Sequence, residues 1–347
     1  MNATHASESR MGWCAIGLPL AATLSLVAVV GGQQSTFAIS GRVITSNGTP
    51  PHDLTVTIGH DEGNGSTASL FELEPDGRFR SEGQRPGRYL IYVGPHEEPH
   101  AIPARDESGY AAVTVRDADV GPIEIRTRPS ISIKGHLRLE AADQSSSLPT
   151  VRIQAFPAVD GVGIGVGPEH ADVATDGSFE LKSVAGPVVI RCGYDFSNAR
   201  GWWWQGPVLL DGRDITNVPT DFSARQSPEI EVVSTQRPSS VWGIVMDEAG
   251  LPSEAATIVV FSADSALWQP WSSTNEFVQA NQDGRFGAVV PPGRYLAVAF
   301  PAGVVASRTE AFARLSRLKK LATAFELAPG AHARLELTTA RSLPPGR

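Results

Sequence analysis

The chain carries Asp76-Gly77-Arg78-Phe79 and repeats this pattern as Asp176-Gly177-Ser178-Phe179 and as Asp283-Gly284-Arg285-Phe286. Asp-Gly suits a tight turn, because glycine accepts a positive φ angle and aspartate tolerates one. The phenylalanine two residues after the glycine is then the first inward-facing side chain of the next strand. The pattern therefore predicts three equivalent turn-and-strand units along the chain.

Two predicted strands precede each of these turns. The first has a glycine in its middle, and the second lies between the first strand and the turn. The glycine-bearing strands are Phe37–Val43, Ile131–Leu137 and Ser240–Val245. The second strands are Leu54–Ile58, Val151–Phe156 and Ile258–Phe261. Apolar and polar residues alternate between the turns, which predicts sheets with one buried face.

A second glycine turn comes nine or ten residues after the first in each copy. These turns are Pro86-Gly87-Arg88-Tyr89, Ala185-Gly186-Pro187-Val188 and Pro292-Gly293-Arg294-Tyr295. Each one begins a strongly apolar strand. The second copy is degenerate, because Val188 stands where the other copies have tyrosine.

Taken together, the glycine-bearing strand and the two turns resemble the carboxypeptidase regulatory-like domain. The resemblance covers nearly all of the chain after residue 32, in three copies. It implies a prealbumin-like or Ig-like β-sandwich of about seven strands, without catalytic residues. The same short pattern occurs in starch-binding-like sandwiches, so both families remain open.

We therefore expect an all-β chain, a tandem array of three β-sandwich modules after an N-terminal signal peptide. The predicted divisions are residues 1–32 for the signal peptide, 33–128, 129–236 and 237–340 for the modules, and 341–347 for a loose tail. In the third module, apolar residues spaced by three over Glu310–Ala322 predict one short amphipathic helix with a basic, solvated face.

Length and composition agree with this organisation. A chain of 347 residues is long enough for two or three domains. Its 34 glycines and 26 prolines are scattered, which indicates many turns and not one disordered tract. The net charge of −8 gives no general attraction for phosphates, so we exclude nucleic acid as a partner.

The N-terminus has the pattern of a secretory signal peptide. Met11–Gly32 contains no charged residue and ends in Val30-Gly31-Gly32, which suits signal peptidase. The alternative is an uncleaved anchor, which is the one condition under which we expect membrane contact. We expect an exported protein: periplasmic, cell-surface or secreted. Cys192 then has no disulfide partner and is expected to be a buried, unreactive thiol.

No segment predicts catalysis, a metal site or a cofactor. His96-Glu97-Glu98-Pro99-His100 has two histidines four apart, but its prolines favour a solvated loop over a helix that holds a metal. Gly161–Gly167 is glycine-rich, but no helix start follows it to bind phosphate. His136 and His332 have no evident serine or aspartate partner. We expect a protein that is not an enzyme.

The run Trp202-Trp203-Trp204 is the least ordinary feature of the sequence. In a strand, Trp202 and Trp204 point to one side and Trp203 to the other, so at least one indole lies near a surface. Exposed indoles stack on sugar rings or contact proteins; the alternative is that these residues, with Trp268 and Trp271, fill a core and a seam between modules. The primary hypothesis is an exported structural or interaction protein. The alternative is a carbohydrate-binding protein that uses Trp202, Trp203 and Trp204. Under either hypothesis, we expect the partner of this chain to be a protein or a polysaccharide outside the cytoplasm.

Overall fold

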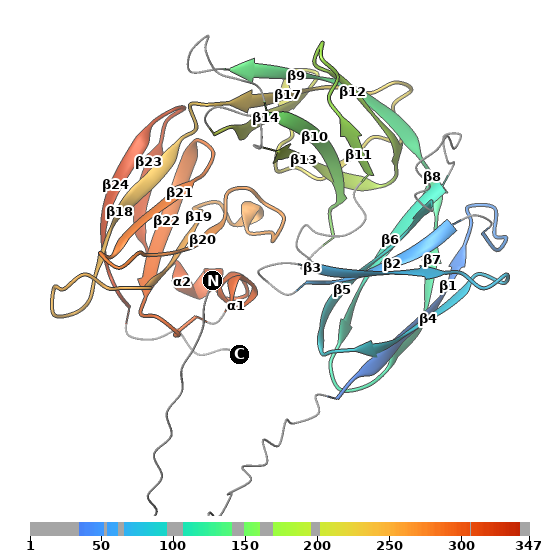
Figure 1. The fold of residues 1–347 in the computed structure, drawn as a ribbon, viewed down its shortest axis with the longest axis horizontal. Helices are drawn as coiled ribbons and strands as arrows, with labels where there is room; N and C mark the ends of the chain where they lie inside the picture. The colour runs from blue at the N-terminus through green and yellow to red at the C-terminus, as the bar shows by residue number, and fades with distance from the viewer. Residues whose placement is uncertain are drawn as a thin grey trace, which may run out of the picture. The chain divides into compact units, whose positions relative to one another are not determined.

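The computed structural model describes residues 35–51, 54–61, 66–95, 107–140, 149–159, 169–195, 202–305 and 307–340. They belong to the compact unit Ser35–Arg347 and form a nearly all-β fold, which confirms the predicted class (Figure 1). The predicted signal peptide, the segments His96–His100 and Gly161–Gly167, and the tail 341–347 lie outside the described residues. Within the described residues, no helix is long and apolar enough to cross a bilayer.

The first repeat contains two sheets. One has the order β4-β1-β7, with β1 (Phe37–Ile44), β4 (Arg78–Gln84) and β7 (Val120–Arg126). The other has the order β3-β2-β5-β6-β8, with β2 (Leu54–Asp61), β3 (Ser66–Glu72), β5 (Gly87–Pro95), β6 (Glu107–Val115) and β8 (Arg128–Pro129). Strand β1 is antiparallel to β4 and parallel to β7.

The third repeat has the same strand pairing as β1 to β7. Its first sheet has the order β21-β18-β24, with β18 (Ser240–Met246), β21 (Arg285–Val289) and β24 (His332–Thr338). Its second sheet has the order β20-β19-β22-β23, with β19 (Thr257–Ser262), β20 (Glu276–Gln279), β22 (Gly293–Phe300) and β23 (Thr323–Leu327). Strands β18 and β24 are again parallel. A 3-10 helix, η1 (Ser265–Leu267), follows β19.

The second repeat keeps most of this topology and changes one edge. One sheet has the order β12-β9-β17-β14-β15, with β9 (Ile131–Glu140), β12 (Ser178–Val184), β14 (Trp204–Leu210), β15 (Arg213–Asp214) and β17 (Glu229–Thr235). The other has the order β11-β10-β13-β16, with β10 (Thr150–Pro157), β11 (Glu169–Asp172), β13 (Pro187–Asp195) and β16 (Thr220–Asp221). The hairpin β14–β15 is an addition, and the short β16 stands where β6 and β23 stand in the other repeats.

The two sequence signatures of each repeat are partners across neighbouring strands. The pairs are Gly41 with Phe79, Gly135 with Phe179, and Gly243 with Phe286. A Cβ atom built on these glycines would lie 2.6, 2.2 and 3.0 Å from the phenyl rings. Each glycine is therefore needed because the ring of the cross-strand phenylalanine packs over it.

The three Asp-Gly turns share one backbone hydrogen bond to the first strand of their repeat. Gly77, Gly177 and Gly284 have φ angles of 83°, 86° and 70°. Their carbonyl oxygens each accept a 2.8 Å bond from the backbone N–H of the first strand of their repeat, at Val43, Leu137 and Val245. The turn thus fastens the strand that follows it to the strand that opens the repeat.

Each repeat encloses a core of its own between its two sheets. The cores include Ile39, Val56 and Ile91 in the first repeat, Ile133, Ile153 and Leu181 in the second, and Val241, Ile258 and Val260 in the third. In the first and third repeats, the tyrosine of the second turn adds a local bond. The hydroxyl of Tyr89 donates to the Arg85 carbonyl at 2.8 Å, and that of Tyr295 donates to the Pro291 carbonyl at 2.7 Å.

The predicted single helix of the third repeat is two short ones, α1 (Arg308–Phe312) and α2 (Leu315–Leu318). Leu315 and Leu318 are buried on the second sheet, whereas Leu321 is 47% exposed. A straight helix needs 3.6 residues per turn, so apolar residues spaced by three drift around it. The break between α1 and α2 restores the contact of Leu315 and Leu318 with the sheet.

Candidate binding surface

The three consecutive tryptophans have three different environments. Trp202 is 66% exposed, Trp203 is 2% exposed, and Trp204 is half-buried as the first residue of β14. The indole N–H of Trp203 has no hydrogen-bond partner among the described residues. Of this run, Trp202 is therefore the residue that presents most of its ring to solvent.

The start of β14 is held in place by a bridge between the two sheets of the second repeat. The Gln205 side chain accepts a bond from the Cys192 N–H at 2.9 Å and donates one to the Ile190 carbonyl at 3.1 Å. On the other side, Trp204 pairs with Thr235 of β17. Trp202 thus lies two residues before a strand that contacts both sheets of the repeat.

Trp268 and Trp271 are packed side chains. The Trp268 indole N–H donates to the Ser262 carbonyl at 2.7 Å, and its ring meets Phe261 edge-on at 5.7 Å. Trp271 is 5% exposed and packs with Phe156 and Val189 of the second repeat. For these two residues, the alternative of a core and a seam describes the structure.

Two ionisable groups on β13 are shielded from water. Arg191 donates to the carbonyls of Thr216 and Trp271, both at 2.6 Å, and to Asn217 Oδ1 at 3.1 Å. Burial lowers the pKa of Arg191 to about 10, which still leaves it protonated at neutral pH. Burial raises the pKa of Cys192 to about 12, so its thiol stays protonated at neutral pH.

The histidines differ from the sequence-based expectation at one point. Nε2 of His136 contacts the Asp176 carbonyl at 2.8 Å, in the Asp-Gly turn. His332, for which no serine partner was evident, has one: Ser240 Oγ lies 2.8 Å from its Nδ1. The parallel pairing of β18 with β24 brings these two residues together across 92 positions of sequence. Among the described residues, no group of three or more His, Cys, Asp or Glu side chains is placed to hold a metal ion.

Trp242 is a second exposed tryptophan, which sequence analysis did not single out. It lies on β18 and is 44% exposed. The signal was present in the alternation of its strand: Val241 and Gly243 face the core, so the residue between them faces outward.

Comparisons with known proteins show only distant structural likeness. No protein-family model matches the chain, and no curated protein matches it. Similar solved structures include the TIE protein of Bacillus anthracis, at 10% identity and a TM-score of 0.20, covering 88% of this chain and 50% of that one. A streptococcal ancillary pilin has 12% identity and a TM-score of 0.22, covering 88% of this chain and 99% of that one. BcpA, the major pilin subunit of Bacillus cereus, has 10% identity and a TM-score of 0.22, covering 89% and 100%.

Proposed function

We propose that this chain is an exported, non-catalytic structural or interaction protein, built of three carboxypeptidase regulatory-like modules at residues 33–128, 129–236 and 237–340. The observation that carries the proposal is the repetition of one sandwich plan. The glycine–phenylalanine pair and the Asp-Gly turn occur in all three repeats with the same strand partners. Such an array presents several separate surfaces to protein or polysaccharide partners outside the cytoplasm.

Export and partner binding are tested together in cells that produce the tagged full chain. We expect the protein outside the cytoplasm, with a new N-terminus near Gln33, and cross-linked to other surface or secreted molecules. N-terminal sequencing and cell fractionation give the first result, and cross-linking with mass spectrometry gives the second. An intact Met1 on a cytosolic species would contradict the proposal.

Carbohydrate binding is the second candidate function, and the exposure of Trp202 favours it. An indole that is 66% exposed offers a flat apolar face on which a pyranose ring can stack. Trp204, half-buried at the start of β14, supplies the neighbouring surface, and the buried Trp203 supports the fold. Stacking of one ring contributes on the order of 1–3 kcal/mol, by analogy with base stacking.

A titration with neutral glucans and xylans tests this candidate. Trp202→Ala is expected to abolish binding and leave the melting temperature unchanged. Trp203→Ala is the contrasting variant and is expected to lower stability. If the wild-type chain binds none of the glycans, or if Trp202→Ala binds as well as wild type, the candidate fails.

A further inference from the structure

The outer face of the sheet β21-β18-β24 has an aromatic side chain at its centre. In β18, which lies between β21 and β24 (Figure 1), buried and outward positions alternate, and Trp242 is outward and 44% exposed. The core of the third repeat includes Val241 and Val245 from the opposite face of this strand. The indole therefore contributes to the outer surface of the sandwich and not to its core.

The two cross-strand neighbours of Trp242 leave one side of it open. On β24, the guanidinium of Arg334 lies over the indole, 5.3 Å from the ring centroid. On β21, the neighbour is Gly287. A Cβ atom built on Gly287 would meet no atom closer than the Val241 carbonyl oxygen at 4.0 Å. The surface beside the indole, at Gly287, is thus a flat area without a side chain, which we call the shelf.

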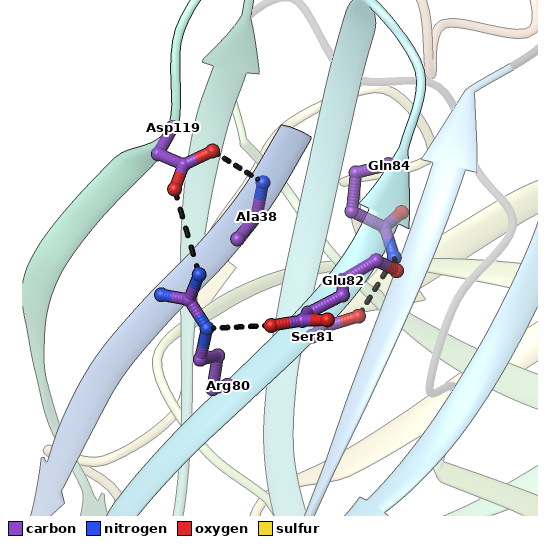
Figure 2. Close-up of polar contacts among 6 residues, drawn as sticks. All are labelled: Ala38, Arg80, Ser81, Glu82, Gln84 and Asp119. Atoms are coloured by element: carbon purple, nitrogen blue, oxygen red, sulfur yellow. Dashed lines mark hydrogen bonds and ion pairs between the residues drawn. The ribbon is translucent and has the colours of Figure 1, made fainter. Parts of the chain in front are cut away.

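The equivalent position in the first repeat is an ordinary charged surface. There, Ser40 pairs with Arg80. Figure 2 shows Arg80 between two carboxylates: it donates to Glu82 at 3.0 Å and lies 3.5 Å from Asp119. In place of the shelf beside Trp242, the first repeat therefore has a side chain already engaged with two acids.

The second repeat also has a charged residue at this position. Lys134 stands where the third repeat has Trp242, and its partners on the two neighbouring strands are Glu180 and Glu229. A lysine between two glutamates is a normal solvated sheet surface. The third repeat departs from both by combining an exposed indole, a neighbouring glycine and a stacked arginine.

The charges around the shelf select an anionic occupant. Arg285 on β21 and Arg334 on β24 both face outward, although the whole chain has a net charge of −8. Among the outward positions of these three described strands, Glu336 is the one acidic residue, and it is 3.9 Å from Arg334. The hydrogen-bonded Ser240 and His332 add polar groups at one end of the face.

We propose that this face binds an acidic polysaccharide, with one sugar ring over Gly287 against the Trp242 indole and sugar carboxylates near Arg334 and Arg285. An indole face suits the apolar side of a pyranose, and guanidinium groups suit carboxylates. The inference goes beyond the proposed function and uses a site in a different repeat from Trp202.

The test is a titration of the full chain with polygalacturonate and alginate, and with dextran as the neutral control. We expect binding of at least one acidic polymer, weakened several-fold between low and high salt, whereas any binding of dextran should be independent of salt and unchanged in Trp242→Ala. Trp242→Ala should weaken binding at least tenfold. Gly287→Thr should weaken it equally, because its side chain fills the open shelf at a position where nothing else is displaced. Arg334→Gln should reduce both affinity and salt dependence.

Two controls keep the result specific. Lys134→Ala changes the same sheet position of the second repeat, and Trp202→Ala removes the other tryptophan that is exposed among the described residues; both should bind the acidic polymer as wild type does. Unchanged melting of Gly287→Thr shows that its loss of binding is local. The inference is overturned if neither acidic polymer binds, if Trp242→Ala weakens the binding of dextran equally, or if Trp242→Ala or Gly287→Thr binds the acidic polymer normally. Loss of binding in Trp202→Ala alone would also overturn it and would assign the ligand to the second repeat.

Discussion

The second repeat differs from the first and third at one edge, although all three share the glycine–phenylalanine pair and the Asp-Gly turn. In the first repeat β6 pairs with β5 at seven positions, and in the third β23 pairs with β22 at five. In the second, β16 pairs with β13 at two positions, and the chain between them forms β14 and β15 on the other sheet.

This difference separates the contacts that every repeat needs to form the sandwich from contacts that one repeat can lose. The pair Gly135 and Phe179 persists in the second repeat, so this contact belongs to the common framework. The tyrosine of the second turn is replaced by Val188, and the edge strand beside it is reduced to two residues. Trp202 lies in the segment that leads into the added hairpin β14–β15. The part of the second repeat that departs from the common topology therefore carries the first candidate surface.

The largest expected effect on stability comes from the segment of the second repeat that leads into β14. Trp203→Ala should destabilise the second repeat by about 3–5 kcal/mol, because it removes a large side chain that is 2% exposed. Trp202→Ala, one residue earlier, should change stability by less than about 0.5 kcal/mol. Urea unfolding followed by tryptophan fluorescence measures both; equal effects would show that the two environments are misassigned.

Gly243→Val tests the common framework in the third repeat. A Cβ atom there would lie 1.9 Å from the Leu335 carbonyl oxygen, a backbone atom that cannot move aside cheaply. We expect a loss of about 3 kcal/mol or more. The matched control is Gly287→Ala on the neighbouring strand, where the space is open and stability should be unchanged or slightly higher. Calorimetry of the full chain distinguishes the two, and a harmless Gly243→Val would refute the packing described here.

Gly77→Val and Gly284→Val test the turn that all repeats share. Both glycines have positive φ, where a β-branched residue is strained, so each change should cost about 1–3 kcal/mol. Each variant should weaken its own repeat and leave the others folded. Hydrogen exchange resolved by peptide mass spectrometry locates the loss, and uniform loss across the chain would contradict independent modules.

Tyr295→Phe and Tyr89→Phe measure what the second repeat lacks. Each removes one hydroxyl bond to a carbonyl four residues earlier, at a cost of about 1 kcal/mol. The effect should appear in the third or the first repeat respectively, and not in the second, which has Val188. Pulse proteolysis in urea gives the size and the location of the change. A cost near zero would mean that the bond is only incidental to the turn.

The last expected effect is absent at neutral pH and appears as a pH dependence of the second repeat. Burial raises the pKa of Cys192 to about 12, so above the ordinary thiol pKa the unfolded chain loses a proton that the folded chain keeps. Stability should therefore be constant below about pH 8.5 and fall as pH rises toward 10, by at most about 1.4 kcal/mol per pH unit. Cys192→Ala should remove this slope, whatever its effect on stability at pH 7. A slope that survives in the variant would assign it to other groups.

Sequence alone predicted the elements that depend on local pattern. The Asp-Gly turns, the glycine-bearing strands and the strands that follow them all lie where alternation placed them. The sequence could not predict which sheet β14 joins. That depends on contacts between distant residues, namely the pairing of β14 with β17 and the Gln205 bridge to β13. The same reason explains the missed Ser240–His332 contact, which depends on the parallel pairing of the first and last strands of the repeat. Trp242 was predictable from its strand's alternation, but Gly287 beside it was not.

The parallel pairing of the first and last strands also has a mechanical consequence. In the third repeat, the chain enters β18 at Ser240, beside His332, and leaves β24 at Thr338, beside Met246. A tensile force on the two ends of this repeat would therefore pull β18 and β24 in opposite directions along their length. The evenly spaced hydrogen bonds between parallel strands would then carry the load together, in shear, and would not open one at a time. The same geometry recurs in β1 with β7 and in β9 with β17, so each repeat in the series has a pair of strands suited to resist stretching.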